Sequence, residues 1–132
     1  LEINSAVLAA MGERDAWHHR LWRGEVAWLL PLIDHVRLHA CQSLTRAHGS
    51  DWPTRWQLPE GMSPETAHEY NPLRCELGYL KTLLRSQPAL CRDGRVKPEL
   101  IGQAHWIRNE LAHYHPVEFA QVRELLMMVG AG

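Results

Sequence analysis

An apolar stripe with the period of an α-helix runs through the first third of the chain and limits what it can fold into. Its six residues recur at alternating spacings of four and three: Trp22, Val26, Leu29, Ile33, Val36 and Ala40. This spacing places all of them on one helix face. Pro31 falls inside the stripe without shifting its phase, although an interior proline removes a backbone hydrogen bond. We therefore expect one kinked helix from Asp15 toward Gly49 rather than two helices.

A short helix is expected ahead of this long one. Asn4 or Ser5 can cap a helix over residues 6–11. Gly12 is a typical residue just past a helix end, so it would stop the short helix there. Asp15 would then cap the long helix that follows.

Residues 49–71 differ in character from the rest of the chain. They hold three prolines and two glycines and show no sustained apolar period, which indicates a long loop. Trp52 and Trp56 lie within this segment and are expected to anchor it over one end of the bundle. A turn or two of helix could begin at residues 63–65, and Asn71, which precedes a proline, should cap the next helix.

Three further stripes of helical period follow. They are Leu73, Leu77, Leu80 and Leu84; then Leu100, Ile101, Ala104, Ile107 and Leu111; and finally Val122, Leu125, Leu126 and Val129. Turn or end signals at Pro88, Gly94 and Gly130 would separate or close these helices. The sequence therefore predicts one all-α domain over 1–132, an up-and-down bundle of four main helices plus a short N-terminal helix.

The composition excludes several function classes. The net charge of -1 means that any RNA contact must come from a local patch, because non-specific binders of nucleic acid are usually basic. No apolar run approaches the roughly 20 residues of a membrane span. Three cysteines without a C-x-x-C pair favour neither a disulfide framework nor a zinc knuckle. We expect a cytoplasmic protein without a cofactor, and the start at Leu1 rather than Met favours a piece of a longer product.

Histidines and basic residues gather at several places without a decisive pattern. His35 and His39 have the spacing of a zinc-binding pair, but no third ligand or H-E-x-x-H motif accompanies them, so no metal is expected. Basic groups within 14–23 and 92–97 could contact phosphates. Clusters of this kind are more often solvated surface, which is the simpler interpretation.

The helix expected to start at residues 97–99 and to reach His113 has an unusual outward face. At about 100° per residue, Gly102, Trp106, Asn109 and His113 lie opposite the apolar stripe. Asn109 and His113 are four apart, so their side chains can touch. Arg108 lies at the rim between the two faces. This face indicates a surface that meets a ligand or a partner, with Gly102 and Trp106 at a subunit interface.

The segment Arg108-Asn109-x-x-Ala112-His113 resembles the signature of the HEPN superfamily. In that signature an arginine, usually followed by a polar residue, precedes a histidine by a few positions. The helix after Pro116 is similar to the last helix of such domains. The similarity covers the chain from about Pro98 to its end, and it is closest to HEPN domains that end larger bacterial signalling and defence proteins.

The resemblance implies a homodimer whose paired motifs line a shared cleft and, in active members, form a metal-independent endoribonuclease. His113 would transfer a proton at an RNA 2′-hydroxyl or leaving oxygen, and Arg108 would hold the scissile phosphate. Asn109 would orient His113. One histidine per copy would make two copies necessary to supply both a base and an acid. Further RNA contacts are expected from His105, Tyr114 and His115.

Two alternatives stay open at this point. The same face of a HEPN-like domain could dimerise or dock a partner protein, or other domains of a longer protein, without catalysis. The motif could also be a chance match in an unrelated bundle. In that case Arg108 and His113 would be a structural pair near a helix C-terminus, where a histidine interacts favourably with the helix dipole.

Overall fold

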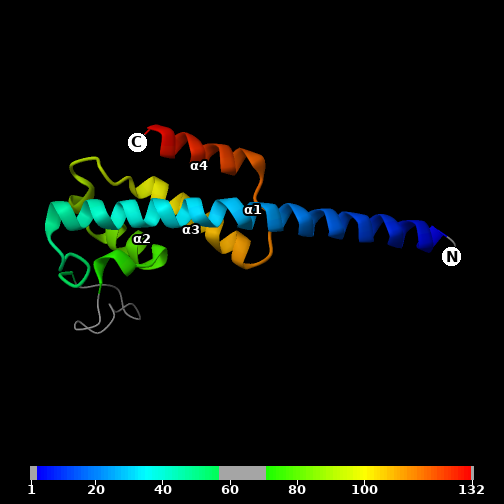
Figure 1. Ribbon diagram of the computed structural model, residues 1–132, viewed down its shortest axis with the longest axis horizontal. Coiled ribbons are helices and arrows are strands. Elements are labelled where there is room, and N and C mark those ends of the chain that lie inside the picture. The colour runs from blue at the N-terminus through cyan, green and yellow to red at the C-terminus, as the bar shows by residue number, and fades with distance from the viewer. Residues whose placement is uncertain (1–2, 57–70, 132) are drawn as a thin grey trace.

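The computed structural model describes residues 3–56 and 71–131, and within these ranges every regular element is a helix (Figure 1). In chain order the elements are α1 (Ile3–His48), η1 (Pro72–Arg74), α2 (Leu77–Ser86), η2 (Pro88–Cys91), α3 (Pro98–Ala112) and α4 (Phe119–Ala131). The predicted all-α bundle with four main helices is confirmed for this part of the chain.

α1 is one helix of 46 residues, about 69 Å long at 1.5 Å per residue. The expected short helix over 6–11 is therefore wrong, because Gly12 lies inside α1 and does not end it. An interior glycine costs a helix only about 1 kcal/mol relative to alanine, which the turns on both sides outweigh. Pro31 also lies inside α1, so the prediction of one helix through the proline is confirmed.

Only part of α1 packs against the rest of the molecule (Figure 1). Its buried residues are Glu25, Leu29, Ile33, Val36, Ala40, Cys41, Ser43 and Leu44, in the C-terminal part of the helix. By contrast, every side chain from Ala9 to Leu21 is exposed. We call residues 9–21 the α1 arm, because this stretch projects from the bundle.

α3 is the central helix of the bundle and contacts α1, α2 and α4. Its buried residues are Ile101, Ala104, Ile107 and Leu111, as the sequence stripe predicts. They join one core with leucines of α2 and with Val122 and Leu125 of α4. Burying a leucine or isoleucine side chain of this size stabilises the fold by about 1.5–3 kcal/mol. This shared core fixes the position of α3 in the bundle.

The tryptophan anchors of the loop after α1 are confirmed where the structure describes it. Trp52 is fully buried and donates from Nε1 to Thr45 Oγ1 at 3.0 Å. Trp56 is partly buried against the same core. Tyr79 of α2 donates from its hydroxyl to the carbonyl of Pro53 at 2.5 Å. The helical turns considered at 63–65 lie outside the described residues.

The helix predicted from Asn71 onward is divided in two. Asn71 caps η1 as expected, since its Oδ1 accepts from the backbone N–H of Leu73 at 3.0 Å. The chain then becomes extended at Cys75, and α2 begins only at Leu77. The reason is tertiary: Arg37 of α1 binds the carbonyl oxygens of Leu73 and Cys75, at 2.7 and 3.1 Å, and so holds the backbone open there.

The last two helices agree with the prediction from sequence except in two details. The Asp93-Gly94 turn is confirmed, with Gly94 at a φ of 75°. α4 continues past Gly130, which does not end it. Leu126, predicted for the core stripe, is 45% exposed, whereas Val122 and Leu125 of the same stripe are buried. Across the described residues, none of the helices combines the length and the apolar character that a membrane crossing requires.

Candidate functional site

The C-terminal end of α3, where the motif lies, is closed by a compact hydrogen-bonded turn. The backbone N–H of His115 donates to the carbonyl of Glu110 at 2.9 Å, and that of Tyr114 donates to Leu111 at 3.1 Å. Together these two hydrogen bonds form a Schellman motif, in which His113 is the C-cap residue of α3. The turn therefore fixes the direction in which the chain leaves the motif.

Tyr114 occupies the position of this turn that glycine usually takes. Its φ is +62°, and among the described non-glycine residues it alone has a positive value. A side chain in this left-handed conformation costs roughly 1–2 kcal/mol. Such strain persists where the surrounding structure holds it in place, and it is frequent at functional sites.

α1 supplies the contacts that hold this turn. Trp22 donates from Nε1 to the carbonyl oxygen of Leu111 at 2.8 Å. The indole also packs on the ring of Tyr114, with centroids 4.9 Å apart, and His19 stacks on the indole at 5.7 Å. In the sequence, Trp22 is recognisable only as a member of the apolar stripe of α1. Its second role, which is to fix the end of the motif helix, was missed.

A buried carboxylate fixes the chain just after the turn. Glu25 of α1 is 7% exposed, and its Oε1 accepts from the backbone N–H of Val117 at 2.8 Å. Burial raises the pKa of Glu25 above its ordinary value, while the hydrogen bond from Val117 acts in the opposite direction. With Trp22, this bond gives the motif two attachments to α1.

Arg108 and His113 are both exposed, so either can reach a ligand. Arg108 lines a hollow of about 450 Å³ between α1, η1, α2 and α3. Positions five apart on a helix differ by about 140° in direction. In keeping with this, no hydrogen bond joins Arg108 to His113 in the described structure. Within one chain the two side chains lie on different flanks of the end of α3.

Asn109 contacts a different histidine from the one named in its predicted role. Its Nδ2 lies 3.4 Å from Nε2 of His105, and that it orients His113 stays a prediction. Both histidines are four positions away, and the amide bonds backward along α3 rather than forward.

His105 lies at the contact between α3 and α2. The imidazole lies over Gly78 of α2, where a Cβ would lie 3.4 Å from His105 Nε2, an ordinary van der Waals distance. The pKa of His105 is lowered, chiefly by burial and then by the positive charges of Lys81 and Arg108. At neutral pH the ring is therefore an uncharged hydrogen-bonding group next to Asn109.

His115 has an acidic partner that the sequence analysis did not single out. Its Nδ1 lies 3.2 Å from Oε2 of Glu110, five residues earlier. Its ring centroid also lies 6.2 Å from that of His113. The turn brings two imidazoles and one carboxylate together, which is a sound arrangement for moving a proton.

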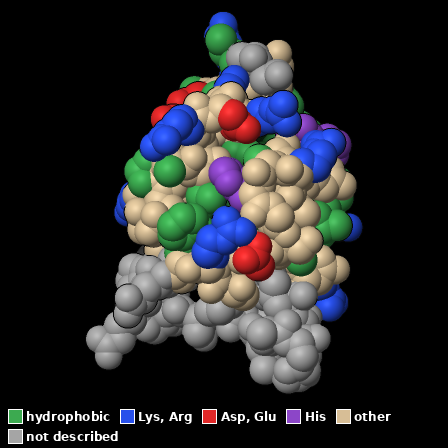
Figure 2. Space-filling model, turned by 90° about the vertical axis from the view of Figure 1, so that its left-hand side faces the viewer, with side chains coloured by type: hydrophobic (Ala, Val, Ile, Leu, Met, Phe, Trp, Pro, Cys, Tyr) green, Lys and Arg blue, Asp and Glu red, His purple; other side chains and the backbone are tan. Residues whose placement is uncertain are grey.

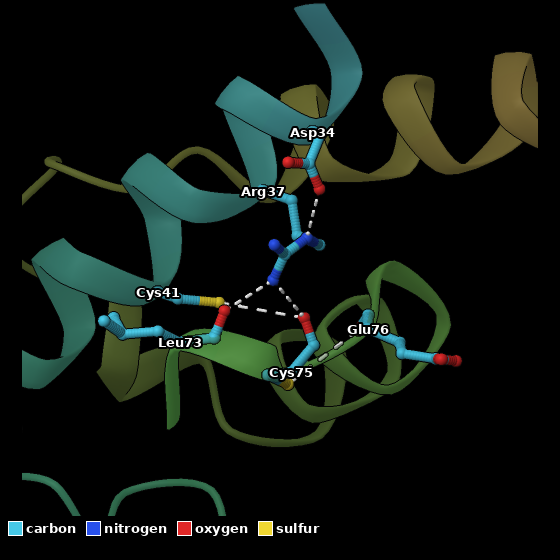
Figure 3. Close-up of polar contacts among 6 residues, drawn as sticks. All are labelled: Asp34, Arg37, Cys41, Leu73, Cys75 and Glu76. Atoms are coloured by element: carbon cyan, nitrogen blue, oxygen red, sulfur yellow. Dashed lines mark hydrogen bonds and ion pairs between the residues drawn. The ribbon is translucent and has the colours of Figure 1, made fainter. Parts of the chain in front are cut away.

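The wall of the Arg108 hollow is built around Arg37 (Figure 3). Arg37 donates from Nε to Asp34 at 3.0 Å, and its Nη1 binds the two carbonyls described above. Cys41, one helical turn further along α1, donates weakly to the carbonyl of Cys75 at 3.8 Å. The pKa of Cys41 is lowered, first by its hydrogen bond with the Cys75 side chain and also by Arg37. The positively charged guanidinium of Arg37 thus binds groups of the protein itself, namely the Asp34 carboxylate and two backbone carbonyls.

Two other arginines face the same hollow. Arg74 of η1 and Arg108 of α3 both line it, and both side chains are exposed. Glu76 is the neighbouring acidic group. Arg74 was absent from the candidate residues, because nothing in its sequence neighbourhood distinguishes it. Only the fold brings it beside Arg108.

Gly102 and Trp106 lie on the outward face of α3. Trp106 is 39% exposed and Gly102 is half-buried, so the indole is accessible to a partner. Their role at a subunit interface stays a prediction. Tyr114 is 72% exposed despite its contact with Trp22, and it too is accessible.

The other clusters noted in the sequence form no site of comparable definition. His35 and His39 line a second hollow together with Asp93, yet no group of three ligands suited to a metal occurs among the described residues. Figure 2 views the end of the molecule where α1 finishes, and Lys and Arg side chains there are scattered among acidic and histidine side chains. The described residues therefore form no continuous basic patch on this face.

The end of α3 thus combines exposed Arg108 and His113 with a strained turn and with two attachments to α1. In comparisons with known proteins, no family model, no curated protein and no solved structure matches the chain.

Proposed function

We propose that this chain is a HEPN-type domain that cleaves RNA as a metal-independent endoribonuclease, in a bacterial defence or stress system. The observation that carries the proposal is the exposure of Arg108 and His113 at a helix end held rigidly by Trp22 and a Schellman turn. The strained backbone at Tyr114 supports the proposal, because such strain is frequent at functional sites. Rigid placement is what a catalytic group requires.

The proposed reaction is an attack within the RNA strand. His113 accepts the proton of the ribose 2′-hydroxyl, and the 2′-oxygen forms a bond with the adjacent phosphorus. The bond from phosphorus to the 5′-oxygen of the next nucleotide then breaks, and a second imidazole donates a proton to that oxygen. The products are a 2′,3′-cyclic phosphate and a 5′-hydroxyl end. Arg108 would stabilise the charge that develops on the phosphate.

The placement of the two motif residues supports a homodimer. On an ideal helix, side chains five positions apart point about 140° apart, so one copy is not expected to surround a phosphate with both Arg108 and His113. Two copies related by a two-fold axis would place His113 of one beside Arg108 of the other, and the partner subunit's His113 would be the imidazole that donates the second proton. Gly102 and Trp106 are the proposed contact residues. The exposed indole is of the type enriched at interfaces.

RNA contacts beyond the scissile phosphate are proposed on both flanks of the end of α3. Arg74 and Arg108 line one hollow, where two guanidinium groups suit neighbouring phosphates. On the other flank, Tyr114 and His115 are exposed and could stack on a base or bind a phosphate. His105, uncharged at neutral pH, would position Asn109 and contact RNA through that amide.

The test is RNA cleavage in the presence of EDTA, with identification of the product ends. The unmodified protein should cleave and leave 2′,3′-cyclic phosphates, whereas His113→Ala and Arg108→Ala should each lose cleavage while keeping the helical circular dichroism signal. His39→Ala and Arg92→Ala are matched controls, because both residues are exposed and lie outside the proposed site. Equal cleavage by all five proteins would exclude this site.

A non-catalytic interaction module is the second candidate, and the exposed indole of Trp106 favours it. The net charge of -1 is also typical of a protein-binding surface rather than an RNA-binding one. In this case the outward face of α3 would bind a second copy, a partner protein or another domain of a longer protein. Trp106→Ala should then abolish that association, and the protein should show no salt-dependent RNA binding.

A further inference from the structure

The α1 arm exposes more apolar surface than a solvated helix needs. Every side chain of the arm is exposed, and Trp17 and Leu21 are 62% and 42% exposed. A helix segment of this length without a tertiary partner is only marginally stable in water. Contiguous exposed apolar residues mark a surface that another molecule covers.

These residues follow the repeat of a coiled coil. Positions at alternating spacings of four and three form a stripe: Ala10, Arg14, Trp17, Leu21, Gly24 and Trp28. All six are exposed. The stripe lies about 120° around α1 from the buried stripe that contains Leu29 and Ile33. A stripe of this period is the seam along which a second helix packs.

The charges on and beside the seam select the orientation of a second copy. A parallel pair would place Arg14 against its own counterpart inside the seam, which is repulsive. In an antiparallel pair with the two-fold axis between Asp15 and Ala16, Arg14 lies instead on the partner subunit's Trp17, a favourable cation–π pair. Ala10 then meets the partner subunit's Leu21.

The flanking charges select the register as well. With the axis between Asp15 and Ala16, Glu13 lies beside the partner subunit's Arg20, and symmetry repeats this ion pair once more. Shifting the register by one heptad in either direction places Glu13 opposite Glu13 or Arg20 opposite Arg20. Of these three registers, only the one with its axis between Asp15 and Ala16 therefore pairs Glu13 with the oppositely charged Arg20 of the partner subunit.

We infer that the α1 arm is the docking surface for a second copy of this chain, packed as an antiparallel coiled coil around an axis between Asp15 and Ala16. The partner is a second copy of this chain because the seam is complementary to the same seam running in the opposite direction. Arg14 then contacts the partner subunit's Trp17, and Glu13 lies beside the partner subunit's Arg20. This interface is separate from the outward face of α3, so it is independent of the proposed cleavage of RNA.

The interface is tested by exchanging the charges of Glu13 and Arg20 and measuring the mass of the protein in solution. The measurement uses a Trp106→Ala background, so that contact through α3 does not hold two copies together. Sedimentation equilibrium should give about twice the chain mass of 15.2 kDa. Glu13→Arg alone and Arg20→Glu alone should each give the monomer, because each places like charges together. Glu13→Arg combined with Arg20→Glu should restore the dimer.

The rescue by the double variant distinguishes this interface from a structural effect within one chain. Glu13 and Arg20 are seven residues apart on one helix, about 10 Å along its axis, and do not meet within a chain. Arg92→Glu, a charge reversal at an exposed position away from the arm, should remain a dimer. A monomeric parent, dimeric single variants or a monomeric double variant would each overturn the inference.

Discussion

Trp22 and Leu111 are joined by a hydrogen bond across 89 positions of sequence, from the indole Nε1 to the backbone carbonyl oxygen at 2.8 Å. The carbonyl belongs to the last turn of α3, where helical partners run out. The donor comes from α1 at the point where the α1 arm leaves the bundle. The position of the motif thus depends on a residue far away in the chain.

Replacing Trp22 by phenylalanine should lower the free energy of unfolding by about 1 kcal/mol, because an aromatic ring stays in place but the bond to the Leu111 carbonyl is lost. The measurement is urea denaturation followed by circular dichroism. Trp28→Phe is the matched control, since Trp28 is 47% exposed, and it should change stability by less than about 0.5 kcal/mol. Equal losses in the two variants would mean that the hydrogen bond contributes nothing.

The backbone strain at Tyr114 can be measured by comparing two substitutions. Tyr114→Gly and Tyr114→Ala both remove the ring contact with Trp22, so they differ in backbone preference alone. With φ at +62°, the alanine variant should be less stable than the glycine variant by about 1 kcal/mol. Thermal or urea unfolding of both variants gives this difference directly.

Glycine should have the opposite effect at the last residue of α3. Ala112 is exposed and helical, so Ala112→Gly should lower stability, by up to about 1 kcal/mol, relative to the unmodified protein. If glycine were no better than alanine at position 114, the left-handed conformation of Tyr114 would not be a source of strain.

Local periodicity predicted the helices because each buries one apolar stripe. α3 begins at Pro98 and buries Ile101, Ala104, Ile107 and Leu111, as its spacing indicates. Where prediction failed, a tertiary contact or a weak local signal was the cause. Gly12 has a propensity cost too small to end a helix, and the break before Leu77 depends on Arg37 of a different helix.

Local periodicity also predicted part of the candidate site, but not the residues that other helices bring to it. The exposure of Arg108 and His113 follows from their positions relative to the apolar stripe of the helix, which can be read from the sequence. Trp22, Glu25 and Arg74 reach the site only through folding, because they lie 34 or more positions away along the chain. The bond between Asn109 and His105 also escaped prediction, since the local spacing allows either histidine as the partner.

The lowered pKa of His105 should be visible by NMR titration of its ring protons. Burial is the chief cause, and the charge of Lys81 adds to it. The ring should therefore titrate below its ordinary value of 6.5, and Lys81→Gln should move the midpoint upward. Lys97→Gln, which removes a charge at the other end of α3, should leave it unchanged. A His105 midpoint at or above the ordinary value would contradict this assignment.

The buried carboxylate of Glu25 should make stability depend on pH in a direction opposite to that of a salt-bridged acid. Its folded pKa is raised above 4.5, so the folded state takes up the proton at a higher pH than the unfolded state does. As the pH falls from above the folded pKa to below 4.5, this group should therefore add stability. The added stability is lost again as the pH rises through the folded pKa.

Glu25→Gln isolates this contribution, because the amide oxygen can still accept from Val117 but does not titrate. The difference in unfolding free energy between the unmodified protein and Glu25→Gln should shift in favour of the unmodified protein as the pH falls through this range. Glu25→Ala should lose about 1–3 kcal/mol, since the Val117 N–H is then buried without a partner, and the loss should grow as the pH falls. A difference that stays constant with pH between the glutamate and glutamine proteins would show that the Glu25 pKa is not raised by folding.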